Sequence, residues 1–191
     1  ENYASAPASQ ELERVAPGIR KIMMVAGFRW EKDQDTLINT LAHLPEKFHL
    51  FLVGDGVRRR ECEALASQTG VAGRVHFLGI RSDVPSLLQS ADYVVMSSHF
   101  EGLSLSSVEG MSVGKPFLAS DVDGLREVVG GAGILFPHGN AEFLAAAITS
   151  LEASPVQYKR VAEACLCRAS QFDISKMADG YARVYKACEA E

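Results

Sequence analysis

The sequence has no apolar run long enough to cross a bilayer as a helix. Such a helix needs about 20 consecutive apolar residues, and no apolar run in this chain approaches that length. The first 18 residues are polar and lack the charged-then-apolar pattern of a secretory signal peptide. We therefore expect neither a transmembrane segment nor a signal peptide.

Cysteine is scarce, and the few that occur do not form a recognisable motif. The four cysteines are Cys62, Cys165, Cys167 and Cys188, and neither a CxxC spacing nor a Cys/His cluster is visible. Cys165 and Cys167 are two apart in a helical stretch, so they point to different faces of that helix. We expect reduced thiols in a cytoplasmic protein, with no disulfide and no metal site.

Positive charge is not in excess either. Nineteen lysines and arginines stand against 24 aspartates and glutamates, which leaves a formal net charge of −5. A broad nucleic-acid surface needs a basic face, so we expect no nucleic-acid partner. With 191 residues, 47% of them hydrophobic and 23% charged, the chain has the composition of an ordinary globular domain.

The apolar pattern alternates between strand-length runs and helical periodicity. Six runs have the length of buried strands: RKIMMVAGF, FHLFLVGDG, RVHFLG, the run at Tyr93–Met96, KPFLAS and AGILFP. Helical spacing lies between them, and it is clearest after Asn140, which we expect to cap a helix. This order predicts an α/β fold with a doubly wound parallel sheet of about six strands and helices on both faces.

The predicted domain organisation has three parts. Residues 1–18 are rich in Ala, Ser and Pro, which is typical of a linker or a disordered start. Residues 19–172 carry the strands and form a Rossmann-like domain. Residues 173–191 form a last helix after a bend near Phe172, on which Tyr181 and Tyr185 are expected to share a packed face.

The stretch from Ser97 to Pro116, SSHFEGLSLSSVEGMSVGKP, joins a buried strand to a helix. On one interpretation Ser106 caps that helix and Glu109 closes a capping box. On the other, Glu101 and Glu109 face an anionic ligand whose phosphates rest on the intervening backbone N–H groups. The start of a helix and the carboxyl edge of a parallel sheet both favour such a ligand.

Two other motifs have local explanations. Asp121-Val122-Asp123 is a DxD that elsewhere holds a metal with a sugar nucleotide, but here it follows a strand and precedes Gly124, which favours a turn. Gly54-Asp55-Gly56 follows the second strand, not the first, and Arg59 stands where the dinucleotide fingerprint needs its third glycine.

Taken in order, these pieces resemble the C-terminal, donor-binding domain of group 1 (family 4) retaining glycosyltransferases of the two-domain GT-B type. An Arg/Lys loop is followed by LVGDG, VHFLG, an E-x7-E motif made by Glu101 and Glu109, and DGLREVV. The resemblance covers about residues 20–190. It implies that a nucleotide-diphosphate sugar, with uridine or guanosine as its nucleoside, is the donor and that no metal or other cofactor is required.

The resemblance also implies roles for individual residues in two groups. Lys32 resembles the family lysine that contacts the diphosphate, and Glu101 the acid near the transferred sugar, which we treat as the catalytic residue. The family arginine is missing, because Gly27 occupies its position, and Arg29 is the expected substitute.

The second group binds the rest of the donor. The resemblance implies that Gly102, Leu103 and Ser104 offer backbone N–H groups to the phosphates. Gly79 and Ile80 correspond to the segment that meets the base, and Glu109 to the acid that accepts the ribose hydroxyls.

The function implied is transfer of a hexosyl group to a saccharide or lipid-linked acceptor, as in polysaccharide biosynthesis. The acceptor, and a peripheral location at the inner membrane face, would depend on an N-terminal domain that this chain lacks. We therefore expect the last helix to pack toward that domain and the chain alone to be inactive. The alternatives are another GT-B sugar-nucleotide enzyme, such as an epimerase or phosphorylase, and a non-catalytic nucleotide-binding module.

Overall fold

The structure is a computed structural model that describes residues 3–14 and 18–188. Six parallel strands form one sheet in the order β3-β2-β1-β4-β5-β6. The strands are β1 (Arg20–Val25), β2 (Phe48–Val53), β3 (Val75–Gly79), β4 (Tyr93–Met96), β5 (Phe117–Ser120) and β6 (Ile134–Phe136). The predicted α/β fold is confirmed, and each strand lies within the run that predicted it.

The α-helices alternate with these strands and then close the chain. They are α1 (Gln10–Glu13), α2 (Gln34–Ala42), α3 (Arg59–Gln68), α4 (Val84–Gln89), α5 (Leu105–Ser112), α6 (Asp123–Val129), α7 (Ala141–Ala153), α8 (Pro155–Ala169) and α9 (Ile174–Cys188). Short 3-10 turns are η1 (Tyr3–Ser5), η2 (Trp30–Lys32), η3 (Ala72–Arg74) and η4 (Ser170–Phe172). Asn140 caps α7 as predicted, because its side chain accepts from the N–H of Phe143 at 2.8 Å.

The helices form two groups around a core dominated by the sheet. Helix α2 contacts α3 and α7, whereas α5 contacts α6 and α8. The strands between them are almost continuously apolar, since a parallel sheet covered on both faces buries both sides of each strand. Residues Met23, Phe51, Val95 and Leu118 are fully buried examples.

The direction of strand order reverses between β1 and β4. The chain passes from β1 to β2 and β3 on one side, and then returns to place β4 against the other edge of β1. In open α/β sheets, ligands bind outside the carboxyl ends of the strands at such a reversal. The loops that follow β1 and β4 are therefore where a functional site is expected.

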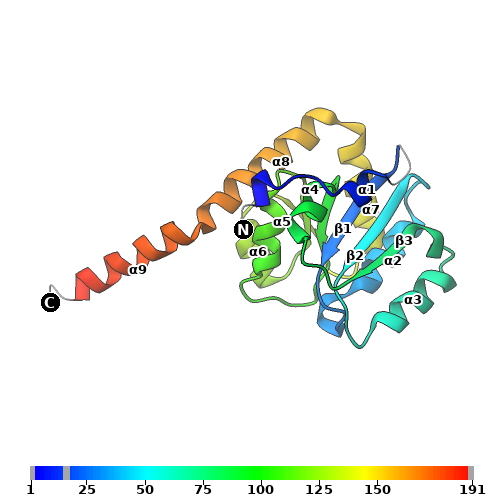
Figure 1. Cartoon of the computed structure of the whole chain (residues 1–191), viewed down its shortest axis with the longest axis horizontal. Coiled ribbons are helices and arrows are strands. Elements are labelled where there is room, and N and C mark those ends of the chain that lie inside the picture. The colour runs from blue at the N-terminus through cyan, green and yellow to red at the C-terminus, as the bar shows by residue number, and fades with distance from the viewer. Residues whose placement is uncertain (1–2, 15–17, 189–191) are drawn as a thin grey trace.

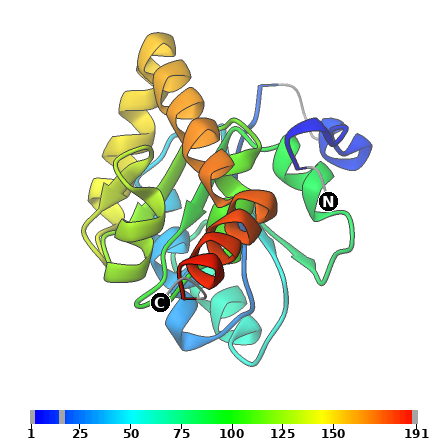
Figure 2. The same cartoon turned by 90° about the vertical axis from the view of Figure 1, so that its left-hand side faces the viewer.

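The segment before β1 is packed where the structure describes it. Leu12 is buried, and the N–H of Ser9 donates to Ser90 Oγ at 2.7 Å and to the carbonyl of Ser86. The segment lies beside α4 in both views (Figures 1 and 2). The side chain of Leu12 and two hydrogen bonds from one backbone N–H therefore hold this segment against the domain. A linking role for residues 1–18 stays a prediction.

The last helix lies apart from the body of the domain. Helix α9 projects away from the sheet and from α8 in Figure 1. Its side chains Ile174, Tyr181, Val184 and Tyr185 are exposed. Among the described residues no neighbouring element covers Tyr181 and Tyr185, so the packed face expected for them stays a prediction.

Candidate functional site

Lys32 and Glu101 meet at the reversal point of the sheet. The Lys32 Nζ lies 2.5 Å from Glu101 Oε1, and the two side chains are only 19% and 10% exposed. Lys32 ends the turn η2 after β1, while Glu101 lies in the loop after β4. The sequence predicted both residues, and the sheet order brings them together.

Buried serines hold the two loops against each other. Ser97 Oγ donates to the carbonyl of Asp33 at 2.7 Å, which joins the end of β4 to the start of α2. Ser98 Oγ donates to Glu101 Oε1 at 2.8 Å, and Ser120 Oγ donates to the carbonyl of Ser98 at 2.5 Å. These three serines are fully buried. The hydroxyl of Ser98 therefore holds the Glu101 carboxylate, and that of Ser120 holds the backbone of Ser98.

Sequence reasoning did not assign roles to Ser97, Ser98 and Ser120. The available signal was a run of small polar residues directly after an apolar strand. Such residues are equally typical of an ordinary loop without a functional role, because hydroxyl groups often form hydrogen bonds to nearby backbone in turns.

The start of α5 differs in detail from the predicted cap. Ser104, not Ser106, is the N-cap residue, and its side chain accepts from the N–H of Ser107 at 3.3 Å. The capping box of Ser106 and Glu109 is therefore wrong, because the helix begins two residues earlier at Leu105. Glu109 is left free of a capping role, with its side chain in the second turn of α5.

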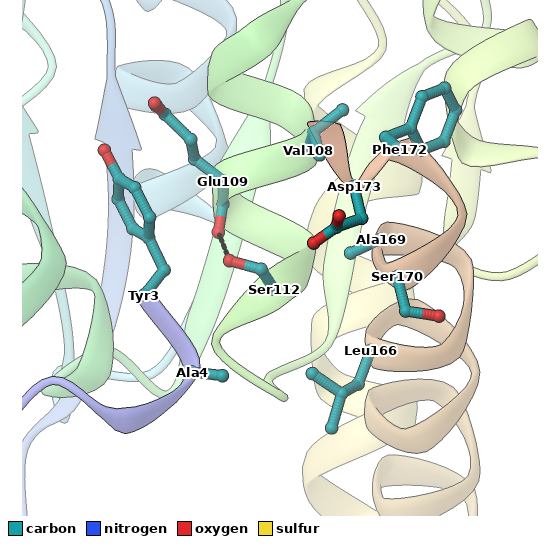
Figure 3. Close-up of a pocket in the computed structure, with 10 residues that line it drawn as sticks. All are labelled: Tyr3, Ala4, Val108, Glu109, Ser112, Leu166, Ala169, Ser170, Phe172 and Asp173. Carbon is teal, nitrogen blue, oxygen red and sulfur yellow. Dashed lines mark hydrogen bonds between the residues drawn. The ribbon is translucent and has the colours of Figure 1, made fainter. Parts of the chain in front are cut away.

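Glu109 lines a cavity of about 670 Å³ on the side of α5 that faces the N-terminal segment and α8. Tyr3 lies on the same wall, while Ser170, Phe172 and Asp173 form the opposite one (Figure 3). The carboxylate of Glu109 points away from Asp173 in this view. Glu101 and Lys32 do not line this cavity, so the two acids of the E-x7-E motif face different surroundings.

The guanidinium of Arg29 lies next to Gly27. Its Nε is 3.5 Å from the position that a Cβ would take on Gly27. The side chain is mostly exposed and pairs with Glu31 at 3.5 Å. A side chain at position 27 would therefore begin in van der Waals contact with this guanidinium.

The remaining predicted residues lie around the same sheet edge. Gly79 ends β3 with a φ of 70°, and its carbonyl accepts from the N–H of Gly54 at 2.8 Å. Ile80 follows with its side chain 84% exposed. Gly102 and Leu103 are exposed between Glu101 and the cap of α5.

The Gly54-Asp55-Gly56 loop is explained by close packing. A Cβ on Gly54 would lie 2.1 Å from the carbonyl oxygen of Ala26, and one on Gly56 would lie 2.4 Å from that of Phe28. The DxD residues are also explained locally, because Asp121 and Asp123 pair with Arg126 at 2.7 and 2.9 Å.

Trp30 covers one flank of the site. Its ring lies 4.5 Å from that of His99 and 6.2 Å from that of Phe100, centroid to centroid. Trp30 nevertheless remains 60% exposed. The ring therefore contributes packing to the loop after β4 and still presents one surface to solvent.

Asp33 begins α2 in an unusual backbone conformation. Its φ of 49° lies in the left-handed region, and its carboxylate accepts from the Thr36 N–H at 3.3 Å and from Thr36 Oγ1 at 2.6 Å. Burial raises the pKa of Asp33, and the bonds from Thr36 partly offset that effect. This acid is held rigidly one residue after Lys32.

The chain resembles known proteins in sequence and in structure. Residues 19–154 match the model of the family described as "Glycosyl transferases group 1". The N,N'-diacetylbacillosaminyl-diphospho-undecaprenol alpha-1,3-N-acetylgalactosaminyltransferase of Campylobacter jejuni is 30% identical over 166 residues, which are 86% of this chain and 44% of that protein. The lipopolysaccharide core biosynthesis glycosyltransferase LpsE of Rhizobium meliloti is 34% identical over 144 residues, 74% of this chain and 42% of that one.

Among solved structures, Anabaena Alr3699/HepE in complex with UDP has a TM-score of 0.84 and 28% identity, covering 89% of this chain and 49% of that one. The chain spans about half the length of the curated relatives it matches. No helix among the described residues is both long and apolar enough to span a membrane. Because the family match covers most of its length and the sheet has the fold of these structures, the chain belongs to the group 1 glycosyl transferases.

Proposed function

We propose that this chain is the donor-binding half of a retaining glycosyltransferase that moves a hexosyl group from a nucleoside diphosphate sugar to a saccharide or lipid-linked acceptor. The observation that carries the proposal is the contact between Lys32 and Glu101 at the reversal point of the sheet. A cation and an acid from different loops, both largely buried, are suited to a ligand that carries a diphosphate and a sugar.

The diphosphate is proposed to bind between Lys32 and the start of α5. Lys32 acts as a compact point charge, and Arg29 can form a fork onto two oxygens. Backbone N–H groups from Gly102 to Ser104 lie at the positive end of the α5 dipole. Together these groups offer the diphosphate positive charge from two sides.

The nucleoside is proposed to bind farther along the same edge. Glu109 accepts the two ribose hydroxyls, because an ionised carboxylate is an acceptor only and a diol offers two donors. The backbone of Gly79 and Ile80 meets the base. The exposure of Ile80 supports this arrangement.

Catalysis is proposed to depend on charge that develops on the leaving diphosphate. As the bond between sugar and phosphate oxygen breaks, negative charge grows there, and fixed cations stabilise the transition state more than the ground state. The departing phosphate assists front-face attack by the acceptor. Glu101 positions and polarises the sugar without forming a covalent bond, and transfer requires no metal.

The relatives support the choice of donor and acceptor class. Anabaena Alr3699/HepE was solved with UDP and with UDP-glucose, which makes a UDP-sugar the first donor to test, with GDP-sugars second. The Campylobacter jejuni relative is named for a diphospho-undecaprenol acceptor, which favours a lipid-linked acceptor. LpsE is named for lipopolysaccharide core biosynthesis, which favours polysaccharide biosynthesis.

The acceptor is proposed to bind mainly to an N-terminal domain outside this chain. The exposed apolar face of α9 would pack toward that domain, and donor binding without turnover is expected from the chain alone. The four free cysteines agree with a cytoplasmic location. The proposed N-terminal domain would hold the protein at the inner membrane face.

The proposal is tested by titrating UDP, GDP and ADP, and their sugars, against the chain by calorimetry. Lys32→Ala removes the positive charge and should lower the affinity for the preferred ligand by about 10- to 150-fold, because a charged hydrogen bond is worth about 1.5–3 kcal/mol. Lys159→Ala, which removes an exposed lysine on α8, is the matched control and should bind as the wild type does. Equal affinity of Lys32→Ala and wild type would refute the proposed site.

A further inference from the structure

Three potential metal ligands converge beside the proposed donor site. Asp33 follows the first strand, His99 the fourth and His138 the sixth. One ligand atom from each, a carboxylate oxygen or a ring nitrogen, lies within 4.8 Å of the other two. Because these three residues are far apart in the sequence, they form no recognisable metal-binding motif there.

The ligand atoms face one another. His99 Nδ1 lies 3.8 Å from Asp33 Oδ2 and directly contacts His138 Nε2. The two imidazole rings are edge to face, with centroids 4.5 Å apart. Two ligands of a tetrahedral zinc ion are separated by about 3.3 Å, given bonds of about 2.0–2.2 Å. Small rotations of the exposed His138 side chain adjust its nitrogen to that spacing.

Two of the three ligands are already oriented by their surroundings. The Thr36 hydroxyl donates to Asp33 Oδ2 at 2.6 Å, an outer-shell bond of the kind that orients metal-binding carboxylates. The backbone N–H of His99 donates to the carbonyl of Glu31 at 2.8 Å, and the His99 ring packs against that of Trp30 at an angle of 46°. Only His138 must adjust, so the cost of assembling the site is low.

We propose that Asp33, His99 and His138 bind a divalent transition-metal ion of the zinc type. Two imidazoles and one carboxylate suit Zn²⁺, whereas Mg²⁺ and Ca²⁺ prefer oxygen ligands. Three protein ligands leave one coordination position for water. The ion joins the loops after β1, β4 and β6, and therefore holds the loop that carries Glu101 against the one that carries Lys32.

Metal binding is tested without donor, so that its failure is distinguishable from failure of the proposed transfer reaction. Zn²⁺ and Mg²⁺ are titrated by calorimetry into the whole chain after removal of bound metal. Exposed thiols also bind zinc, so all measurements use a background in which the exposed Cys167 and Cys188 are replaced by serine. Co²⁺, a spectroscopic substitute for zinc, reports coordination geometry through its visible absorption.

We expect one equivalent of Zn²⁺ to bind and to raise the melting temperature, with no such effect of Mg²⁺. His138→Ala and His99→Asn should each lower the affinity for Zn²⁺ by more than about 10-fold. Even the loss of an outer-shell partner lowers metal affinity by about 10- to 100-fold. His43→Ala, which removes an exposed histidine outside the cluster, should bind as the background does.

Two results would overturn the site. One is failure of the background protein to bind an equivalent of Zn²⁺, which would leave only hydrogen bonds among the three residues. The other is unchanged Zn²⁺ affinity in His138→Ala. Because His138 lies exposed on a loop, this variant is expected to fold even if His99→Asn does not.

Discussion

Lys32 and Glu101 form a nearly buried ion pair across the reversal point of the sheet, with 2.5 Å between Nζ and Oε1. Each residue is therefore a partner of the other. A diphosphate that binds Lys32 must share the lysine with this carboxylate. The pair thus couples the proposed phosphate-binding cation to the proposed catalytic acid.

This coupling predicts opposite changes in the affinity for a nucleoside diphosphate when the charge of Lys32 or of Glu101 is removed. In Glu101→Gln the amide keeps the shape of the side chain but removes a negative charge that repels the diphosphate. Solvent still reaches both side chains, and charge pairs open to solvent are worth about 0.2–1 kcal/mol. We therefore expect the nucleoside diphosphate to bind about 1.4- to 5-fold more tightly. Calorimetry with UDP measures this, and Glu127→Gln on the exposed face of α6 is the control. A loss of affinity as large as that of Lys32→Ala would contradict the arrangement.

The cap of α5 can be tested with two neighbouring serines. Ser104→Ala removes the oxygen that accepts from the Ser107 N–H and should cost about 1 kcal/mol, within a range of about 0.5–2. For a chain of this size that corresponds to a melting temperature lower by about 2–4 °C. Ser106→Ala, two residues along, should change stability little. Equal effects in thermal denaturation would mean that the helix begins elsewhere.

Gly124 supports the backbone of the acid loop. A Cβ at this position would lie 2.0 Å from the carbonyl oxygen of Glu101 and 2.5 Å from that of Gly102. Gly124→Ala should therefore displace this loop, destabilise the protein by about 1–3 kcal/mol and weaken UDP binding. A Cβ on Gly73 meets no atom within 4 Å, so Gly73→Ala is the control for the same change. If Gly124→Ala kept the wild-type stability and UDP affinity, a side chain at position 124 would not displace the loop that carries Glu101.

A histidine pair on β2 and β3 should make stability depend on pH. His49 Nδ1 and His76 Nε2 lie 2.9 Å apart. Burial lowers the pKa of both side chains, helped by Arg74 for His49 and by His49 for His76. Below about pH 6.5, the ordinary value, the unfolded chain therefore binds more protons than the folded one. The free energy of unfolding should fall as the pH drops through this range.

His76→Phe tests this dependence, because the new ring can still stack on Phe51, whose ring lies 4.4 Å from that of His76. Urea unfolding at several pH values between 5 and 8 should show a flatter dependence in this variant than in wild type. His43→Gln, with an exposed histidine, should keep the wild-type dependence. An unchanged slope in His76→Phe would assign the effect to other groups.

The sequence by itself determined the strands, the helices and the chemistry available at each loop. Ile22–Met24 and Leu50–Val53 are the buried parts of β1 and β2 because these side chains are all apolar. Asn140 caps α7 through a bond to a residue three positions away. Such features depend on neighbours in the chain. Lys32 and Glu101 could also be proposed as site residues at this level, since the motifs that carry the family resemblance lie in contiguous stretches.

Only the tertiary structure decided which of these residues meet. The return of β4 to the free edge of β1 pairs Lys32 with Glu101 and gathers Asp33, His99 and His138. The packing of the segments at the two ends of the chain buries Leu12 in the core and leaves Tyr181 exposed. These relationships join segments far apart in the chain, and they follow from sheet order and packing, which local periodicity does not encode.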